Sequence, residues 1–227
     1  MSTDAAQVAV TPAARAVPRP VIDGVARRVR RLCRKHAAKL PFHGWHHVGF
    51  VRDKAAYFAG RNGADPSVAE TAALVHDLNY IVRRNSSAAA GRELRMPLLA
   101  KAGVEALAAE WIDDVVVEAE MCTRTRDISL EAQALSDADT LFKALPTTPV
   151  VLAHRYLEEN GIGLAELAAK IVGEQGTPHD DGFYFYDEEA ARRYGRWATA
   201  NLELWRCIQE SLDDQDVDNL LGAIPRS

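Results

Sequence analysis

Residues 73–80 read Ala-Leu-Val-His-Asp-Leu-Asn-Tyr, so an apolar segment ends in a histidine followed directly by an aspartate. Upstream, Asp65-Pro66-Ser67 is typical of a helix start, and apolar residues recur at helical spacing from there to His76. Neighbouring helical residues point about 100° apart, so His76 and Asp77 can reach one ion only if it lies between their directions near the helix end. The segment predicts a helix that carries two metal-ligand side chains at its C-terminal end.

Helical spacing continues along almost the whole chain, whereas the period of two that is typical of strands is almost absent. Residues 79–91 are expected to form a loop that leads into a further helix. The fold expected is all-α, with one helical domain over residues 21–227 and a flexible N-terminal tail over residues 1–20. The sequence predicts further helices over residues 21–38, 43–60, 104–122, 129–145, 150–160, 164–174 and 188–212.

The composition is that of a globular protein. The 227 residues are 48% hydrophobic and 26% charged, which suffices for a sizeable core and argues against a disordered or fibrous chain. The chain has 27 basic and 32 acidic residues, and the resulting net charge of −5 disfavours nucleic-acid binding by the surface as a whole. We find no apolar run of the roughly 18 residues that a membrane-spanning helix requires.

The cysteines and the N-terminal residues favour a cytoplasmic protein. Cys33, Cys122 and Cys207 are far apart and odd in number, so neither a disulfide framework nor a zinc knuckle is expected. The first 20 residues are rich in Ala and Pro and lack the basic and apolar regions of an export signal.

A second segment places histidines beside the predicted core. Residues 42–47 read Phe-His-Gly-Trp-His-His, and His43 and His47 are four residues apart, so a helix brings both to one face. His46 points about 100° away from His47 and is the weaker candidate.

A third segment adds two carboxylates. Within residues 134–142, Asp137 and Asp139 flank an apolar stripe, and helical periodicity alone does not decide which of them faces the core. Imidazole nitrogen and carboxylate oxygen are ligands that suit Zn²⁺, Mn²⁺ and Fe²⁺. Burying several such groups without an ion or other partners would be costly, so the three segments together predict a metal site.

The order of these motifs resembles the signature of the HD superfamily of metal-dependent phosphohydrolases. The resemblance rests on His47, on the His76-Asp77 pair, and on Asp139 within Ala138-Asp139-Thr140-Leu141. Residues 42–47 are similar to the Tyr-His-Asn-x-x-His opening common in that group. The match covers about residues 42–142 and implies an HD-domain-like helical bundle with extra C-terminal helices.

The resemblance also implies roles for these residues. The ligands of a divalent ion (Mn²⁺, Co²⁺, Mg²⁺, Zn²⁺ or Fe²⁺) would be His47, His76, Asp77 and Asp139. His43 matches a position that donates a proton to the leaving oxygen in related cyclic-nucleotide phosphodiesterases. Asp77, or Asp137 as the carboxylate that does not bind the ion, would orient or deprotonate a water. Candidate phosphate contacts are Lys143, Arg83 and Arg84.

Two departures from the family pattern narrow the prediction. Relatives that hydrolyse guanosine tetraphosphate or deoxynucleoside monophosphates carry acidic residues after the His-Asp pair, whereas residues 78–81 here read Leu-Asn-Tyr-Ile. Binuclear relatives use two more histidines, but residues 78–138 contain none. A single-metal site is therefore expected, unless Glu118 or Glu120 supplies an oxygen ligand.

The function expected is that of a metal-dependent phosphohydrolase that attacks a small phosphorylated metabolite or nucleotide with a metal-activated water. Two alternatives stay open: an iron-dependent oxygenase of the HD type, and a non-catalytic nucleotide-binding regulatory protein on the same scaffold. The expected partner is the phosphorylated small molecule, with neither membrane nor specific nucleic acid. The long apolar helix faces would support a homodimer.

Overall fold

The computed structural model describes residues 15–121 and 124–224, and the helix that precedes the His-Asp pair lies at its centre. This helix, α3 (Pro66–Val75), begins where the Asp65 side chain accepts a hydrogen bond from the Ser67 N–H. Every residue from Val68 to Val75 is buried. Most of these side chains are alanine or valine, so neighbouring helices can pack closely against α3 on all sides.

Two helices flank α3 and pack on each other: α2 (Trp45–Asn62) and α7 (Leu130–Ala144). Helix α2 ends at Gly63, whose φ of 85° is a left-handed conformation that suits glycine. Helix α7 begins at Ser129, whose hydroxyl accepts from the Ala132 N–H. These three helices carry all three predicted metal-ligand segments.

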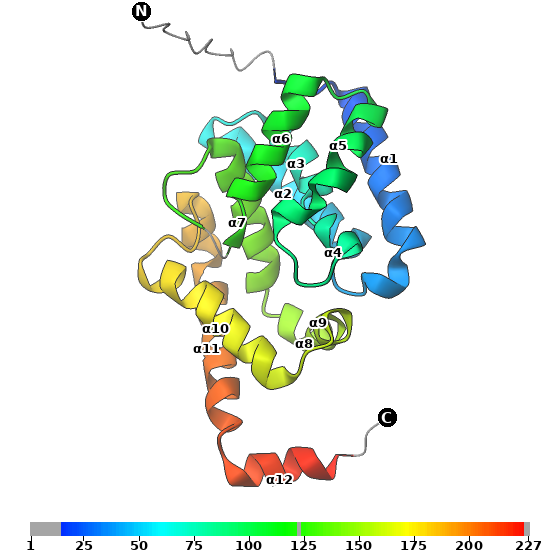
Figure 1. Cartoon of the computed structure of the whole chain (residues 1–227). Coiled ribbons are helices and arrows are strands. Elements are labelled where there is room, and N and C mark those ends of the chain that lie inside the picture. The colour runs from blue at the N-terminus through cyan, green and yellow to red at the C-terminus, as the bar shows by residue number, and fades with distance from the viewer. Residues whose placement is uncertain (1–14, 122–123, 225–227) are drawn as a thin grey trace, which may run out of the picture.

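A second group of helices covers α3 from the other side (Figure 1). It consists of α1 (Arg19–Lys35), α5 (Arg92–Ala102) and α6 (Ala106–Glu118). Arg95 is fully buried and donates from Nε to Asp113 Oδ1 at 2.6 Å, which joins α5 to α6. Breaking such a buried pair leaves an uncompensated charge, so this contact fixes the two helices relative to each other.

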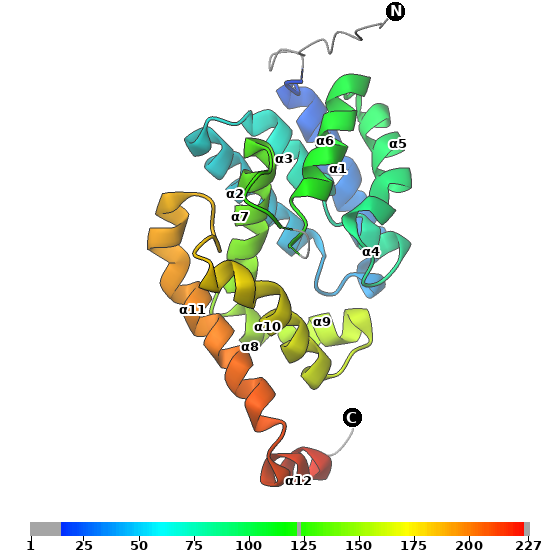
Figure 2. The same cartoon turned by 60° about the vertical axis from the view of Figure 1, so that its left-hand side comes forward.

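The C-terminal helices form a layer against α7 (Figures 1 and 2). In this layer α11 packs on α7 and α10 packs on α11. Helix α12 lies at the far end of α11, apart from the other helices in both views, and none of its residues is buried. The layer contains α8 (Thr148–Val151), α9 (Ala153–Asn160), α10 (Leu164–Asp180), α11 (Glu188–Ser211) and α12 (Gln215–Ala223).

The all-α prediction is confirmed: residues 15–121 and 124–224 contain no strand. None of their helices is long and apolar enough to cross a membrane. The predicted tail falls mostly on residues 1–14, outside the described residues, and α1 already begins at Arg19. Cys122, the predicted end of the helix over residues 104–122, is also outside them.

Other boundaries needed correction. Residues 79–91 contain two short helices, α4 (Asn79–Val82) and η3 (Ala88–Gly91), and η2 (Ala37–Lys39) follows α1. Helix α10 continues past residue 174 to Asp180. Its last turns bury Gln175, Gly176 and Pro178, and this packing outweighs the low helix propensity of the glycine and the proline.

Candidate metal centre

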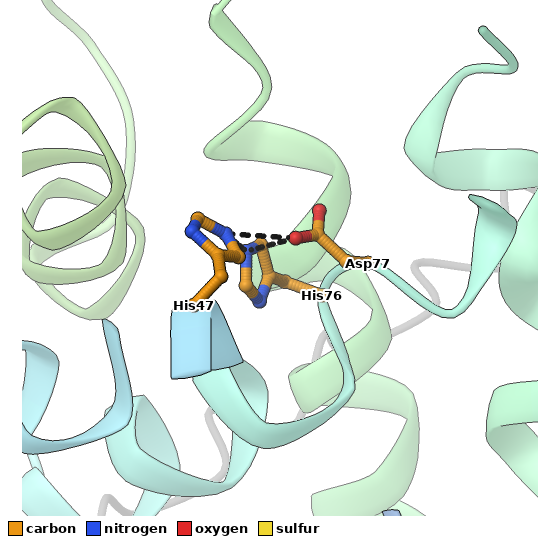
Figure 3. Close-up of side chains that lie close together, drawn as sticks. All are labelled: His47, His76 and Asp77. Carbon is orange, nitrogen blue, oxygen red and sulfur yellow. Dashed lines mark hydrogen bonds and ion pairs between the residues drawn. The ribbon is translucent and has the colours of Figure 1, made fainter. Parts of the chain in front are cut away.

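Three of the predicted ligands meet at one point. His47 lies in the first turn of α2, and His76 and Asp77 follow the last residue of α3. Figure 3 shows both imidazole rings directed at one oxygen of Asp77. Asp77 Oδ2 lies 2.8 Å from His47 Nε2 and 3.0 Å from His76 Nε2, and the two nitrogens are 3.2 Å apart.

The spacing of these atoms fits a bound ion. Metal–ligand bonds of about 2.1 Å place neighbouring ligand atoms about 3.0 Å apart at right angles and about 3.4 Å apart in a tetrahedron. The distances within His47, His76 and Asp77 lie near this range, and Asp139 Oδ1 is 3.5 Å from His47 Nε2. We call these four side chains the metal cluster.

The second nitrogen of each histidine shows how the ring is held. His76 Nδ1 donates to the carbonyl oxygen of Ala73 at 2.8 Å, so a neutral His76 presents the lone pair of Nε2 to the cluster. His47 is fully buried, and within the described residues its Nδ1 has no hydrogen-bond partner. Burial lowers the pKa of the His47 imidazole, against the opposing effect of Asp77, and so favours the neutral form that binds metals.

The carboxylates of the cluster stay charged. Burial by itself would raise the pKa of Asp77, but His76, His43 and His47 together hold that pKa well below its usual value. Asp77 Oδ2 is buried with no hydrogen-bond partner in the described residues, although two imidazole nitrogens lie beside it. Two imidazole nitrogens and charged carboxylate oxygens are a donor set that would suit a divalent cation.

Asp139 is shared between the cluster and a lysine. Its Oδ2 pairs with Lys143 Nζ at 2.7 Å, one helical turn further along α7. Burial would raise the pKa of Asp139, but Lys143 and the histidines lower it. Lys143 thus lies beside the cluster, and its role as a phosphate contact stays a prediction.

His43 has a buried partner that the sequence did not indicate. Its Nδ1 pairs with Glu159 of α9, and the other oxygen of Glu159 accepts from the backbone N–H groups of Phe42 and His43 at 2.7 and 3.0 Å. The His43 ring also stacks on Tyr80, with centroids 3.6 Å apart. His43 is therefore held in one orientation from two sides.

Asp137 needs a correction. The structure turns it away from the cluster: its two oxygens accept from the Tyr186 and Asp187 N–H groups at 2.8 and 2.7 Å, and Arg124 lies 3.4 Å away. These contacts anchor the start of α11, so the structure does not bring Asp137 to the cluster and does not support its predicted catalytic role.

Other predicted residues are also apart from the cluster. Arg83 and Arg84 are exposed where the chain leaves α4, and neither lines the cavity described below, so the structure does not support them as phosphate contacts. Glu118 accepts from the N–H and hydroxyl of Ser129 and serves the start of α7. Glu120 accepts from the Ala88 N–H and lines the cavity.

A cavity of about 350 Å³ opens beside the cluster. His76, Asp77 and Asp139 line it, together with His43 and Lys143. Its other side comes from the C-terminal layer, where no local motif marked the residues in advance. These include Tyr156, Leu167, Lys170, Ile171, Gln175, Asn201 and Trp205.

Comparison with known proteins gives a relative and a shared fold. No family model matches the sequence. The Bacillus subtilis (strain 168) protein YpgQ is 31% identical over 126 residues, which are 54% of this chain and 60% of YpgQ. The matched segment thus spans less than two thirds of that relative.

Two solved structures of Bacillus subtilis YpgQ share the fold. The crystal structure of that protein aligns with a TM-score of 0.58 at 22% identity, over 87% of this chain and 99% of the other. Its complex with ADP aligns with a TM-score of 0.57, at the same identity and coverage. The C-terminal layer is thus part of an arrangement of helices that occurs in another protein.

Proposed function

We propose that this chain is a metal-dependent phosphohydrolase of the HD type that acts on a small phosphorylated molecule. The observation that carries the proposal is the convergence of His47, His76 and Asp77, with Asp139 beside them, next to a cavity that His76, Asp77 and Asp139 line. The cavity volume lies in the range of about 300–1,000 Å³ that small-molecule sites occupy.

The residues around the cluster suit attack on phosphorus. A bound divalent ion would lower the pKa of a coordinated water and polarise a phosphoryl oxygen. Lys143 presents a positive charge to the same part of the cavity and would balance charge on the phosphate. Because Glu159 holds His43 at Nδ1, Nε2 is the atom that would pass a proton to the leaving oxygen.

A nucleotide is the substrate class that we favour. The complex of Bacillus subtilis YpgQ with ADP supports it, since that protein shares the fold. The same observation supports a second candidate, a regulatory protein that binds a nucleotide without hydrolysing it. Measured hydrolysis of a nucleotide distinguishes the phosphohydrolase from the regulatory protein.

The test combines metal analysis with a substrate panel. Freshly purified protein should contain a divalent ion, lose it to a chelator, and regain phosphate release from nucleotides when Mn²⁺ or Co²⁺ is restored. Tight nucleotide binding with no turnover by any metal-loaded form would favour the regulatory protein. About two irons per chain with oxygen-dependent turnover would favour the oxygenase.

A further inference from the structure

The C-terminal layer lines one side of the cavity with apolar side chains as well as with polar ones such as Lys170, Glu174 and Gln175. Leu167 and Ile171 lie one turn apart on α10, and Trp205 lies on α11. Trp205 and Leu167 are 4% and 3% exposed, and Ile171 is half-buried. We call these three side chains the Trp205 wall. It offers one aromatic ring and two branched aliphatic side chains, a combination that packs well against a flat ring.

Trp205 also has an unused hydrogen-bond donor. Among the described residues, no group accepts a hydrogen bond from its indole N–H. The indole nitrogen is not one of the buried polar atoms without a partner, so it is accessible from the cavity. Because Trp205 lines the cavity, a ligand with an acceptor atom would supply that partner.

The Trp205 wall is joined to the metal cluster but does not coincide with it. Lys143 pairs with Asp139 through its side chain, and its carbonyl oxygen accepts a hydrogen bond from Asn201 Nδ2. Trp205 lies one turn beyond Asn201, and each such turn advances by about 6 Å. None of the three side chains of the Trp205 wall belongs to the metal cluster, so a phosphate group at the cluster would leave this wall to another part of the same molecule.

We propose that the Trp205 wall holds the flat heteroaromatic ring of the substrate, and that Trp205 is a specificity-determining residue. The inference rests on the proposed function for the position of the phosphate. It assigns the two ends of one nucleotide-like ligand to two halves of the protein, with phosphate at the metal cluster and base between α10 and α11.

The test is a pair of dissociation constants measured by calorimetry on Mn²⁺-loaded protein, one for ADP and one for inorganic pyrophosphate. Trp205→Leu should weaken ADP binding roughly tenfold, as expected for loss of a base–aromatic contact. Pyrophosphate, which has no ring, should bind within roughly twofold of wild type. Trp197→Leu is the matched control, because Trp197 lies on the same helix, is 39% exposed and does not line the cavity.

A second variant controls for misfolding of Trp205→Leu. Ile171→Ala removes a half-buried side chain of the Trp205 wall and should weaken ADP binding roughly threefold without affecting pyrophosphate. Equal weakening of both ligands, or unchanged ADP binding in both variants, overturns the inference. If those variants bind ADP normally while metal-dependent hydrolysis persists, the proposed function stands without this inference. If the variants lose ADP binding selectively and no metal-loaded form hydrolyses a nucleotide, the inference stands and the proposed function fails.

Discussion

The three helices of the metal cluster and the C-terminal layer are stabilised in different ways. In α3 every residue from Val68 to Val75 is buried, whereas α12 buries none and exposes Leu220 and Leu221. The cluster helices hold their ligands through dense apolar packing. The layer instead places part of the cavity wall on helices that contact the rest of the protein less extensively. The side chains of the cluster are therefore held by denser packing than the part of the cavity wall that the layer supplies.

Polar contacts join the two regions. Asp137 of α7 accepts from the Tyr186 and Asp187 N–H groups at the start of α11, and Asn201 of α11 donates to the Lys143 carbonyl. Both contacts lie within four residues of Asp139 on α7. The layer is thus positioned by the same helix that carries a cluster carboxylate.

The largest expected effect is loss of the ion from the cluster helices. Asp77→Ala removes the oxygen that lies beside both imidazoles, so metal content measured by elemental analysis should fall below roughly a tenth of wild type. Asp53→Ala changes an exposed carboxylate on α2 and should leave metal content unchanged. Equal metal content in the two variants would contradict the assignment of the site.

The next effect compares packing in the two regions. Phe58→Ala, at a side chain of α2 that is 1% exposed, should lower the free energy of unfolding by about 3–5 kcal/mol. Leu220→Ala, at a side chain of α12 that is 65% exposed, should change it by no more than about 0.5 kcal/mol. Urea denaturation measures both. A large loss on Leu220→Ala would mean that α12 is packed in solution.

The sequence predicted the cluster helices well because their signals are local. Apolar spacing, the Asp65-Pro66 start and the Ser129 start are each contained within a few residues, and the structure has α3 and α7 close to the expected limits. Glu159 and Trp205 could not be found in this way. Each lies more than 60 residues from the motif residue that it accompanies, and only the packing of the layer brings Glu159 to His43 and Trp205 to the cavity.

The two aspartates of α7 show the same limit. Asp137 and Asp139 both lie at the edges of an apolar stripe, so periodicity left the choice open. The choice depends on what packs against each edge: α2 and α3 meet the Asp139 side, and the start of α11 meets the Asp137 side. The resemblance to the HD signature pointed to Asp139, whose Oδ1 lies 3.5 Å from His47 Nε2.

Glu159→Gln tests whether the layer supports chemistry at the cluster, given the proposed function. The amide would place a donor or a neutral acceptor beside His43 Nδ1 in place of a carboxylate, so proton donation from Nε2 should weaken. We expect kcat for nucleotide hydrolysis to fall roughly tenfold or more, with metal content unchanged. Glu158→Gln alters the exposed neighbour and should have no effect on kcat. Full activity in Glu159→Gln would limit Glu159 to a structural role.

The last prediction concerns how the contact between Asp137 and α11 changes the free energy of unfolding with pH. Burial raises the pKa of Asp137 to about 7, against hydrogen bonds from the Asp187 and Tyr186 N–H groups and the charge of Arg124. In the unfolded chain that pKa is about 3.9. Between these values the folded protein retains a proton that the unfolded chain has released. The contribution of Asp137 to stability is therefore full below about pH 4 and decreases as the pH rises towards about 7.

Asp137→Asn removes this titration and so isolates it. The free energy of unfolding of wild type minus that of the variant should fall with rising pH by at most about 1.4 kcal/mol per unit, and then level off above about pH 7. Urea denaturation at a series of pH values measures the difference. A difference that instead rises with pH between 4 and 7 would mean that Arg124 and the two N–H donors outweigh burial. The contact between α7 and α11 would then be strongest with Asp137 ionised.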